Sequence, residues 1–514
     1  MTKLCAAIFV DQPDEALRQT ALAAEHGADI VELRLDRCPG AEAAREVVAR
    51  SSLPCIATCR PKWEGGHCAL PERQRLELLR AAADAGAAYV DIELEALRRG
   101  APMPRGQAGV IISAHDFAGR PARLHNILLD MENAGGSVHK VAWMARSVRD
   151  NIEAFEILRQ RRRPTIALCM GEAGVISRVL ARKFGAFLTY AATDESGGTA
   201  PGQISLSEIK RLYRWDAVRP DTRVFGVVAC PVGHSMSPAI HNAAFDAAGF
   251  NGIYVPLLVE PGYESFKAFM EDFLGFADLH LGGLSVTIPH KENALRYLEE
   301  KGAEIDPLAR TIGAVNTIVI HRDGQNLRLR GLNTDYGAIL DCLTSALGID
   351  RAGLEGLKVA VLGAGGTGRT AVAALAHYGA DVIVYNRSEE RARSLAAEFN
   401  GRSGRVRCAS LAEVVTSGAT VFINATSVGM YPDAQRSPLG DMCLPCSPGT
   451  VVFDVVYNPP VTLLLKQAQA AGAKTISGVE MFVRQAAAQF TAWTQLPAPT
   501  AVMRRVVHER LGVE

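Results

Sequence analysis

Short apolar runs rich in β-branched residues alternate with longer amphipathic stretches through the first 213 residues. Eight such runs can be read: Leu4–Val10, Ile30–Asp36, Cys55–Arg60, Tyr89–Leu94, Val110–His115, Val138–Ala145, Thr165–Met170 and Phe187–Ala191. Segments such as Glu72–Ala85 and Asn151–Gln160, whose apolar residues recur at helical spacing, separate most of them. Eight strand–helix units in sequence predict a (β/α)8 barrel.

After a short aperiodic segment, Trp215–Thr222, a second alternation begins at Val224. Its predicted strands are Phe225–Ala229, Tyr254–Val259, Gly283–Thr287 and Ala314–Ile320, and predicted helices follow Ser237 and Lys291. We therefore expect a second α/β domain, with a helical C-terminal part from Phe482 onward that packs back on it. A cleft between this domain and the next would hold an active site.

The clearest local motif is KVAVLGAGGTGRT at Lys358–Thr370, where an apolar strand breaks into Gly363-x-Gly365-x-x-Gly368 and then a helix-like stretch. Such a turn lets backbone N–H groups approach a pyrophosphate at a helix N-terminus. The next predicted strand, Asp381–Tyr385, ends in Asn386-Arg387-Ser388, where an NAD-selective site carries Asp or Glu. Because Arg387 suits a 2′-phosphate instead, NADP-linked hydride transfer is the first hypothesis. The alternative is a glycine turn that binds no nucleotide.

Composition limits the classes of partner. At 514 residues, 48% of them hydrophobic, the chain is too long for a single core, so two or three domains are expected. Lys plus Arg equal Asp plus Glu at 55 each, which leaves no net field to recruit nucleic acid or an anionic membrane. No apolar run reaches the roughly 18 residues of a membrane span. Leu4–Val10 is too short for a signal peptide, so we expect a cytoplasmic protein that acts on small molecules.

The CxxC at Cys443–Cys446 lacks a second pair at zinc spacing, and no metal site is expected.

Barrels of this class carry their active sites at the carboxyl ends of their strands. Polar residues gather there in the predicted barrel: Glu32, Arg34, Arg60, Glu93, His115 and Lys140. Lys140 lies within a strand that its neighbours bury, and burial disfavours an ammonium, which would free an amine to attack a carbonyl and form a Schiff base. His115, one strand away, could move protons at neutral pH. Arg34, Arg60 and Arg178 indicate an anionic substrate such as a carboxylate. Alone, His115 would be interpreted as structural and Lys140 as a partner of Glu32 or Glu93; their convergence on one face favours a site.

Candidate chemistry in the second half lies beside predicted helix starts. Ser237-Pro238 is a favoured N-cap and first-turn pair, but a cap does not explain Ser235, and two hydroxyls at a helix N-terminus could bind a carboxylate. Lys291 follows a predicted strand, and Asp335 opens a predicted helix, where N-capping is the simpler interpretation. As a pair, they could deliver a proton to a ketone oxygen as hydride reaches its carbon.

Seven motifs recur together along the first half: Glu32-Leu-Arg34, Arg60-Pro-Lys-Trp-Glu-Gly-Gly66, Asp91-Ile-Glu93, Ser113-Ala-His115-Asp116-Phe117, His139-Lys140-Val-Ala, Gly174-Val-Ile-Ser-Arg178 and Ala200-Pro-Gly-Gln203. In combination they resemble the type I 3-dehydroquinate dehydratases, over nearly all of Leu4–Tyr213. The resemblance implies that Lys140 forms an imine with the ketone of 3-dehydroquinate, that His115 is the general acid and base for loss of water, and that Glu93 orients His115. It implies that Arg178 holds the substrate carboxylate and that residues 194–203 form a lid. The residues that would complete the pocket are Glu32, Arg34, Arg60, Gln203 and Thr199, which stands where this family commonly has Ser.

The second half carries its own set: the Ser235/Ser237 motif, Val286-Thr287-Ile-Pro-His-Lys291, Gly313-Ala-Val-Asn316-Thr, Asn333-Thr-Asp335, the glycine turn, Asn386-Arg387-Ser388, Asn424-Ala-Thr-Ser427 and Gly478–Gln485. Together they resemble shikimate dehydrogenase from Val224 onward. The resemblance implies Lys291 and Asp335 as the catalytic pair. The implied substrate contacts are Ser235, Ser237, Thr287, Asn316, Tyr457 and Gln485. The implied NADP-binding residues are Gly363, Ala364, Gly365, Gly366, Thr367, Gly368, Asn386, Arg387, Ser388 and Arg391, with Thr426 and Met430 near the nicotinamide. Ser285 replaces the Asn common in single-activity bacterial enzymes.

The two resemblances support one another, because the product of the first reaction, 3-dehydroshikimate, is the substrate of the second. The implied fold class is α/β: a (β/α)8 barrel over 1–217, a substrate domain over 222–333, a Rossmann NADP domain over 334–483, and C-terminal helices over 484–514 that pack back on the substrate domain. The expected function is a fused shikimate-pathway enzyme of aromatic amino acid biosynthesis whose substrates are 3-dehydroquinate and 3-dehydroshikimate. The oligomeric state is left open.

Three alternatives remain from the sequence. One is a quinate or shikimate oxidoreductase that uses NAD, which Arg387 argues against. Another is a Schiff-base aldolase in the first half, which would cleave a carbon–carbon bond. The third is a ligand-sensing regulator, against which the lack of a DNA-binding motif and the retention of Lys140 and Lys291 weigh.

Overall fold

The computed structural model describes residues 1–104, 106–193, 202–233, 235–324, 326–401, 403–440 and 442–512. Its internal contacts divide the chain into two units. The first unit comprises Met1–Pro238 and Asn251–Leu281, and the second comprises Ala239–Phe250 and Gly282–Glu514. Among the described residues, no helix has the length and apolar character needed to cross a membrane.

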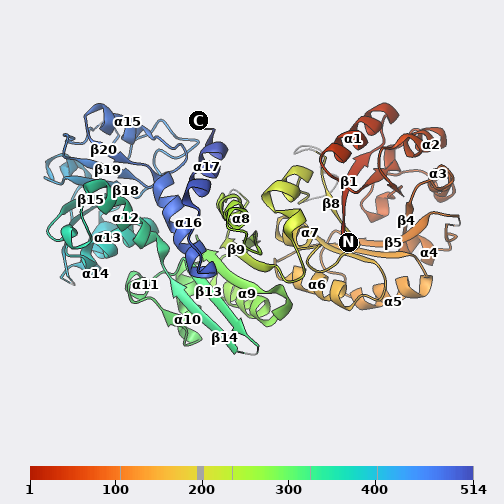
Figure 1. The fold of residues 1–514 in the computed structure, drawn as a ribbon, viewed down its shortest axis with the longest axis horizontal. Helices are drawn as coiled ribbons and strands as arrows, with labels where there is room; N and C mark the ends of the chain where they lie inside the picture. The colour runs from red at the N-terminus through yellow and green to blue at the C-terminus, as the bar shows by residue number, and fades with distance from the viewer. Residues whose placement is uncertain are drawn as a thin grey trace. The chain divides into compact units, whose positions relative to one another are not determined.

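Eight parallel strands form the centre of the first unit (Figure 1). They are β1 (Lys3–Phe9), β2 (Ile30–Arg34), β3 (Cys55–Thr58), β4 (Tyr89–Glu93), β5 (Gly109–Asp116), β6 (Val138–Met144), β7 (Thr165–Met170) and β8 (Leu188–Ala191). Their order is β7-β6-β5-β4-β3-β2-β1-β8, and the N–H of Phe187, just before β8, donates to the carbonyl of Thr165 at the start of β7 at 2.8 Å. The sheet therefore curls into a nearly closed barrel, and the predicted fold of the first half is confirmed.

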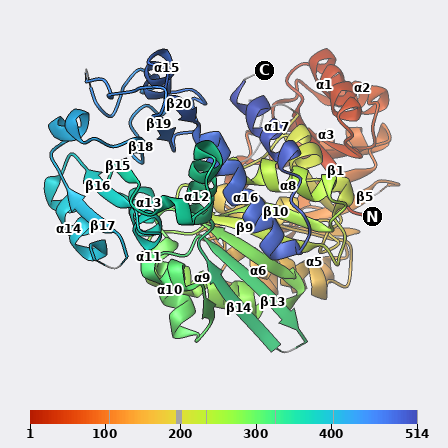
Figure 2. The ribbon, with the colours of Figure 1, turned by 60° about the vertical axis from the view of Figure 1, so that its left-hand side comes forward.

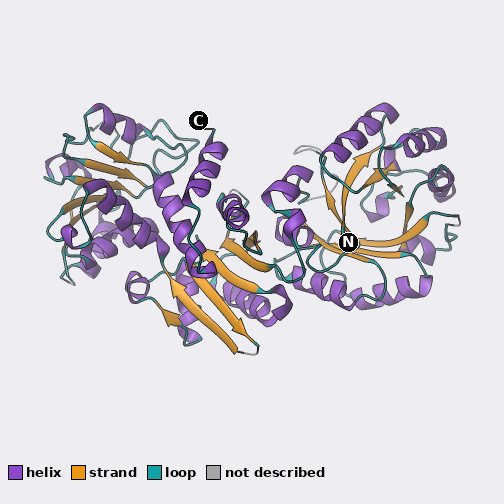
Figure 3. Ribbon diagram, viewed as in Figure 1, coloured by secondary structure: helices purple, strands orange, loops and turns teal. Residues whose placement is uncertain are grey.

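Helices surround these strands (Figure 3). They are α1 (Pro13–Glu25), α2 (Ala41–Arg50), α3 (Glu72–Asp84), α4 (Leu94–Arg98), α5 (Leu124–Ala134), α6 (Asp150–Gln160) and α7 (Val175–Val179). Each amphipathic helix buries an apolar face; α6, for example, buries Ala154, Phe155, Ile157 and Leu158. Parallel strands buried on both faces explain the continuous apolar runs of the sequence.

The first unit also contains β9 (Arg223–Ala229) and β10 (Gly252–Leu258), which pair in parallel, and α9 (Tyr263–Gly275). Aromatic stacking joins them to the barrel: Phe155 lies 4.2 Å from Phe184, and Phe184 lies 5.7 Å from Phe276, between ring centroids. Lys183 of the barrel donates its Nζ to the carbonyls of Pro220 and Thr222, at 2.7 and 2.9 Å. These contacts hold the connecting segment against the barrel.

The second unit begins with an antiparallel group of strands (Figure 2). β11 (Leu281–Val286) pairs with β13 (Thr317–Asp323), which forms a hairpin with β14 (Asn326–Leu332), and β12 (Glu304–Ile305) lies parallel to β14. The helices of this part are α8 (Ser237–Ala247), which belongs to the second unit from Ala239 onward, α10 (Lys291–Glu300) and α11 (Pro307–Ile312).

A six-stranded parallel sheet follows, in the order β17-β16-β15-β18-β19-β20. Its strands are β15 (Lys358–Leu362), β16 (Asp381–Tyr385), β17 (Arg405–Cys408), β18 (Val421–Asn424), β19 (Val451–Asp454) and β20 (Lys474–Ile476). Counted along the sheet this is the 3-2-1-4-5-6 order of a doubly wound dinucleotide fold. Its helices are α12 (Thr334–Leu347), α13 (Gly366–His377), α14 (Glu389–Phe399) and α15 (Leu463–Ala470). The predicted Rossmann fold is confirmed.

The chain closes with α16 (Gly478–Thr494) and α17 (Thr500–Leu511). Ser477 caps α16, so this helix starts four residues before the predicted Phe482. Its far end returns to the antiparallel strands: Trp493 Nε1 donates to the carbonyl of Ile318 at 3.1 Å, and Gln489 Nε2 donates to Thr317 Oγ1 at 3.0 Å.

Candidate active sites

The alternation of side chains along a strand sets which polar residues point into the barrel. Ile30, Ile56, Ile111 and Val138 belong to the buried apolar cluster of the barrel. Two positions further along each strand, on the same face, stand Glu32, Thr58, Ser113 and Lys140, none of them more than 5% exposed. A buried polar layer thus lies at the carboxyl ends of the strands, where the sequence predicts the site.

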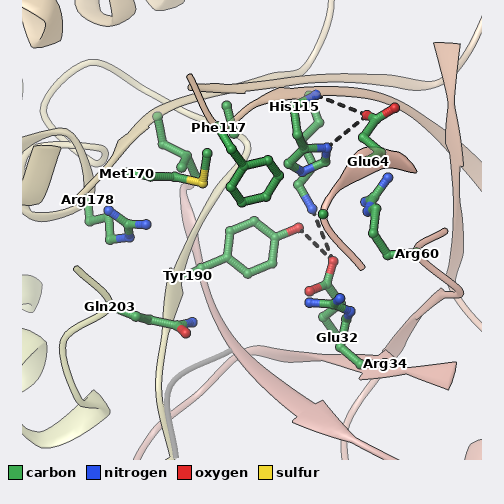
Figure 4. Close-up of a pocket in the computed structure, with 14 residues that line it drawn as sticks. Glu32, Arg34, Arg60, Glu64, His115, Phe117, Met170, Arg178, Tyr190 and Gln203 are labelled. Carbon is green, nitrogen blue, oxygen red and sulfur yellow. Dashed lines mark hydrogen bonds and ion pairs between the residues drawn. The ribbon is translucent and has the colours of Figure 1, made fainter. Parts of the chain in front are cut away.

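This layer borders a cavity of about 150 Å³ (Figure 4). Because an apolar cavity of about 150 Å³ accommodates benzene, the space suits a substrate built on one six-membered ring. Residues predicted for the site from sequence that line it are Glu32, Arg34, Arg60, His115, Lys140, Arg178 and Gln203. The further polar lining residues Glu64 and Tyr190 were not assigned a role from sequence. Thr199, with residues 194–201 of the expected lid, lies outside the described residues.

Lys140 is surrounded by acceptors. Its Nζ lies 3.1 Å from Glu32 Oε1 and 3.4 Å from Asp91 Oδ2, and 4.4 Å from the centroid of the Tyr190 ring. Tyr190 donates its hydroxyl to the same Glu32 oxygen at 3.3 Å. Two carboxylates therefore balance the charge of an amine that faces the cavity.

Glu93, which the resemblance implies as the residue that orients His115, contacts two arginines among the described residues. Glu93 is fully buried, and its Oε1 accepts from Arg60 Nη1 at 2.7 Å, while its Oε2 lies 2.8 Å from Arg75 Nη1. Arg60 also donates to Asp91 Oδ1 at 2.8 Å and to Ser113 Oγ at 2.7 Å. The Glu93 carboxylate thus lies between two arginines, although its Oε2 makes no hydrogen bond among the described residues.

Glu64 makes the contact to His115 instead. This residue lies in the turn of 3-10 helix Lys62–Glu64 that follows β3, and its Oε1 is 3.1 Å from His115 Nδ1 and accepts the His115 backbone N–H at 3.0 Å. Burial raises the pKa of Glu64 to about 8, with Arg60 opposing the rise and Glu93 and Asp91 adding to it. Burial also lowers the pKa of His115 well below its ordinary value, assisted by Arg60 and Lys140. The pair thus combines a neutral imidazole with a carboxyl group that ionises just above neutral pH.

Arg178 lies across the cavity from Arg60 and Glu64 (Figure 4). It is 1% exposed and donates Nη1 to the carbonyl of Cys169 at 2.7 Å, while its Nε has no hydrogen-bond partner among the described residues. Burial lowers the pKa of this guanidinium to about 10. A buried cation that borders the cavity with an unsatisfied N–H is suited to bind an anion. Arg34, by contrast, is paired with Asp36 at 2.6 Å.

In the second unit, Lys291 and Asp335 form an ion pair of 2.6 Å between Nζ and Oδ2. Lys291 is the first residue of α10, and Asp335 lies in the first turn of α12. Asn333, not Asp335, caps α12, since its Oδ1 accepts the N–H groups of Asp335 and Tyr336. The carboxylate of Asp335 is therefore available to Lys291, and the capping interpretation does not account for it.

Hydrogen bonds also join residues of β11, β13 and α16 in this unit. Asn316 Oδ1 accepts from the backbone of Thr334 at 2.8 Å and from Thr317 Oγ1 at 2.7 Å. Ser285 donates to Gln489 Oε1 at 2.9 Å, which links β11 to α16. Ser285 therefore has a structural partner in this chain.

The other predicted substrate contacts lie on several elements. Ser235 accepts the Ser237 N–H at 3.3 Å and α8 begins at Ser237, so Ser235 makes the cap-like bond that the sequence assigned to Ser237. Both serines belong to the first unit. Thr287 directly follows β11. Tyr457 stacks on Phe482 at 4.9 Å, and Gln485 donates to the Phe482 carbonyl at 3.0 Å.

The glycine turn has the geometry that a dinucleotide needs. Gly363 has φ +113°, and a Cβ on Gly368 would lie 2.1 Å from the carbonyl oxygen of Gly363, so the backbone requires both glycines. A Cβ on Gly365 or Gly366 would meet nothing within 4 Å. The start of α13 therefore borders open space, and no side chain of the described residues caps it. Its N–H groups are placed to bind a pyrophosphate.

The end of β16 fits the adenosine 2′-phosphate of NADP. Asn386 Oδ1 accepts the N–H of Ala364 at 3.2 Å, which fixes this corner against the glycine turn. Arg387, Ser388 and Arg391 are exposed beside it. Thr426 borders the turn on the other side, since a Cβ on Gly363 would lie 3.0 Å from its Cγ2, and Met430 is 46% exposed. Two cations and a hydroxyl suit a phosphate, whereas a carboxylate would repel it.

Comparisons with known proteins agree with both halves. Family models match type I 3-dehydroquinase over residues 4–220, the shikimate dehydrogenase substrate binding domain over 227–318, shikimate/quinate 5-dehydrogenase over 347–433, and the shikimate 5′-dehydrogenase C-terminal domain over 478–508.

Similar proteins include a bifunctional enzyme and single shikimate dehydrogenases. The chloroplastic bifunctional 3-dehydroquinate dehydratase/shikimate dehydrogenase of Arabidopsis thaliana is 38% identical and aligns over 96% of this chain and 82% of its own. The NADP(+) shikimate dehydrogenase of Methanosarcina acetivorans is 42% identical over 56% of this chain and 99% of its own. A crystal structure of shikimate dehydrogenase in complex with NADP+ matches 57% of this chain and 97% of its own, with 35% identity and a TM-score of 0.50. The chain therefore belongs to the family of bifunctional enzymes that join a type I 3-dehydroquinate dehydratase to an NADP-dependent shikimate dehydrogenase.

Proposed function

We propose that this chain dehydrates 3-dehydroquinate to 3-dehydroshikimate in the barrel and then reduces 3-dehydroshikimate to shikimate with NADPH. The observation that carries the proposal is the convergence of Lys140, His115 and Arg178 on one ring-sized cavity. The ion pair of Lys291 and Asp335, in the unit that also holds the glycine turn, supports the second step.

In the first reaction, the Lys140 amine attacks the ketone carbon, and one water leaves as the imine forms. His115 removes a proton from the carbon next to the imine, and the electron pair moves to the nitrogen. The imidazolium then returns that proton to the departing hydroxyl, which leaves as water. Hydrolysis of the conjugated imine releases the product and restores Lys140.

The remaining lining residues have distinct tasks in this scheme. Arg178, a buried cation that lines the cavity, binds the substrate carboxylate. Glu64 holds the imidazole of His115 and stabilises its protonated form once the carboxyl is ionised. Glu32 and Asp91 accept hydrogen bonds from Lys140 before reaction, and Arg34, Arg60 and Gln203 bind the ring hydroxyls.

In the second reaction, Lys291 donates a proton to the ketone oxygen, and Asp335 holds the amine in place and stabilises its charge. NADPH, when bound, supplies the hydride. Within the second unit, the residues that contact the substrate are Thr287, Asn316, Tyr457 and Gln485. Gly363–Gly368 bind the pyrophosphate, and Asn386, Arg387, Ser388 and Arg391 bind the adenosine ribose and its 2′-phosphate.

A coupled assay tests the whole sequence. Purified protein mixed with NADPH and 3-dehydroquinate should lose NADPH absorbance, because reduction must wait for dehydration. Borohydride added with 3-dehydroquinate should attach mass at Lys140; an adduct elsewhere would refute the imine assignment. Lys291→Ala should abolish reduction of 3-dehydroshikimate and spare dehydration, and an unchanged reduction rate would refute its role.

We also propose a cytoplasmic location. The eleven cysteines are all free thiols, as expected in a reducing compartment. Fractionation of the native host with an antibody to the chain would test this, and recovery in a membrane or secreted fraction would refute it.

A further inference from the structure

Arg75 is a buried arginine that the proposed chemistry does not use. It belongs to α3, outside the ring of strands, yet its side chain is only 1% exposed. Its Nη1 donates to the carbonyl of Cys59 at 2.9 Å, and its Nε and Nη2 donate to Glu72 at 2.9 and 2.7 Å. The same Nη1 lies 2.8 Å from Glu93 Oε2. Arg75 does not line the cavity, so it reaches the site only through other residues.

Buried charges alternate in sign from Arg75, outside the cavity, to the reactive lysine and Glu32 at its lining. Glu93 bridges Arg75 and Arg60, at 2.8 and 2.7 Å. Arg60 pairs with Asp91 at 2.8 Å, Asp91 with Lys140 at 3.4 Å, and Lys140 with Glu32 at 3.1 Å. The series contains three cations and three carboxylates, so its net charge is zero when all six are ionised. None of the six side chains is more than 6% exposed.

Removal of Arg75, the outermost cation, would leave three carboxylates facing two cations. Water cannot compensate, since Glu93 is fully buried, and a buried carboxylate without its partner is strongly unfavourable. Burial already raises the pKa of Glu93, and Arg60 and Arg75 are the two groups that oppose the rise. Without Arg75, Glu93 would therefore take up a proton and lose its charge toward Arg60.

We propose that Arg75 is a positioning residue of the dehydratase site: it anchors the Glu93 carboxylate, which in turn fixes the guanidinium of Arg60 at the cavity. The inference rests on the proposed dehydration and deepens it. Arg60 is held between Glu93 and Asp91, and Glu93 in turn contacts Arg75 of α3. The placement of Arg60 therefore depends on a residue that does not line the cavity.

The test compares Arg75→Met with Arg73→Met, a matched change on the same helix at a side chain that is 91% exposed. In Arg75→Met, loss of the cation raises the pKa of Glu93 further, so the Glu93–Arg60 pair is weakened and Arg60 is loosely held. As the pH rises, Glu93 ionises and the pair returns. The charged groups that face Glu93 are Arg60, Arg75, Asp91 and Glu64. Because the charge of Glu93 also raises the pKa of Glu64, the ratio of wild type to variant reports the combined effect of losing Arg75 on both carboxyl groups.

We expect kcat/KM of Arg75→Met for 3-dehydroquinate to be about tenfold below wild type at pH 6.5 and to recover toward wild type by pH 9, with KM changing more than kcat. Arg73→Met should match wild type at both pH values. Reduction of 3-dehydroshikimate by the same preparations should be unchanged, which verifies the amount of folded chain. Arg75→Lys keeps the charge, so its pH profile should follow wild type.

A loss of activity in Arg75→Met that is equal at every pH, or a wild-type profile, would overturn the proposal. The same pH dependence in Arg75→Lys would overturn it too, because charge would then not matter. If Arg75→Met does not fold, Arg75→Gln serves in its place under the same criteria. Failure of the wild type to dehydrate 3-dehydroquinate would instead refute the proposed function.

Discussion

Replacement of Glu64 by Gln tests how the carboxyl group beside His115 contributes to dehydration. Gln keeps the oxygen that accepts the His115 backbone N–H at 3.0 Å, but it cannot ionise. Burial, the main cause, raises the pKa of Glu64 to about 8. Wild-type Glu64 is thus neutral at pH 6, like the amide, and becomes charged only as the pH rises through about 8. The cost of the substitution should therefore grow with pH.

The magnitude follows from the geometry. A hydrogen bond between a carboxylate and an imidazolium is worth about 1.5–3 kcal/mol, or about 10- to 150-fold in rate if it forms in the transition state. With a pKa of about 8, about one Glu64 in a hundred is ionised at pH 6 and about ten in eleven at pH 9. The ratio of wild-type to Glu64→Gln activity should thus be below about 3 at pH 6 and about 10 to 150 at pH 9.

The assay is the appearance of the conjugated ketone product by ultraviolet absorbance, at saturating 3-dehydroquinate across this pH range. Glu172→Gln is the control, because Glu172 lies exposed in the turn after β7 and does not line the cavity. Its ratio to wild type should stay near one throughout. A Glu64→Gln ratio that is constant with pH, or that falls as the pH rises, would refute the argument.

Three further predictions concern the rest of the chain. Gly368→Ala places a Cβ 2.1 Å from the carbonyl oxygen of Gly363, so we expect the KM for NADPH to rise at least about tenfold while dehydration is unchanged, as the two separate assays would show. Arg387→Asp should lower kcat/KM for NADPH by about 10- to 150-fold and favour NADH, and steady-state kinetics with both cofactors would reveal an unchanged preference. Lys183→Met removes the donor to the carbonyls of Pro220 and Thr222, so limited proteolysis should cut residues 218–222 about tenfold faster, and wild-type resistance would count against this role.

The fold was largely predictable because burial leaves a periodic record in the sequence. Parallel strands covered on both faces appear as continuous apolar runs, and each of the eight predicted runs overlaps a strand of the barrel. Asp381–Tyr385 has the predicted bounds, since a glycine turn and a polar corner delimit it. The alternation of side chains along each barrel strand likewise determines which polar residues point inward at its carboxyl end. Most of the predicted pocket residues therefore line one cavity.

Partner choice among buried charges was not predictable in this way. The resemblance implied a contact between Glu93 and His115, but Arg75 reaches Glu93 from a helix outside the barrel. Glu64 meets His115 across 51 residues of sequence, from an irregular turn that has no periodicity. Its only signal was its place between Arg60 and Gly66 in a motif whose polar residues had no other evident use. Likewise, Asn333 rather than Asp335 caps α12, because the helix starts one residue earlier than the carboxylate.

The return of α16 to the antiparallel strands has a consequence for synthesis. Ser285 and Gln489 are 204 residues apart in sequence, and Trp493 is 175 residues beyond Ile318. At roughly 5–20 residues per second, a ribosome reaches Gln489 about 10–40 s after it has made Ser285. All eight barrel strands precede residue 192 and emerge first. Translation that stops before α16 would therefore yield a chain with an assembled barrel and an incomplete reductase, and the pathway in such a cell would end at the unsaturated ketone.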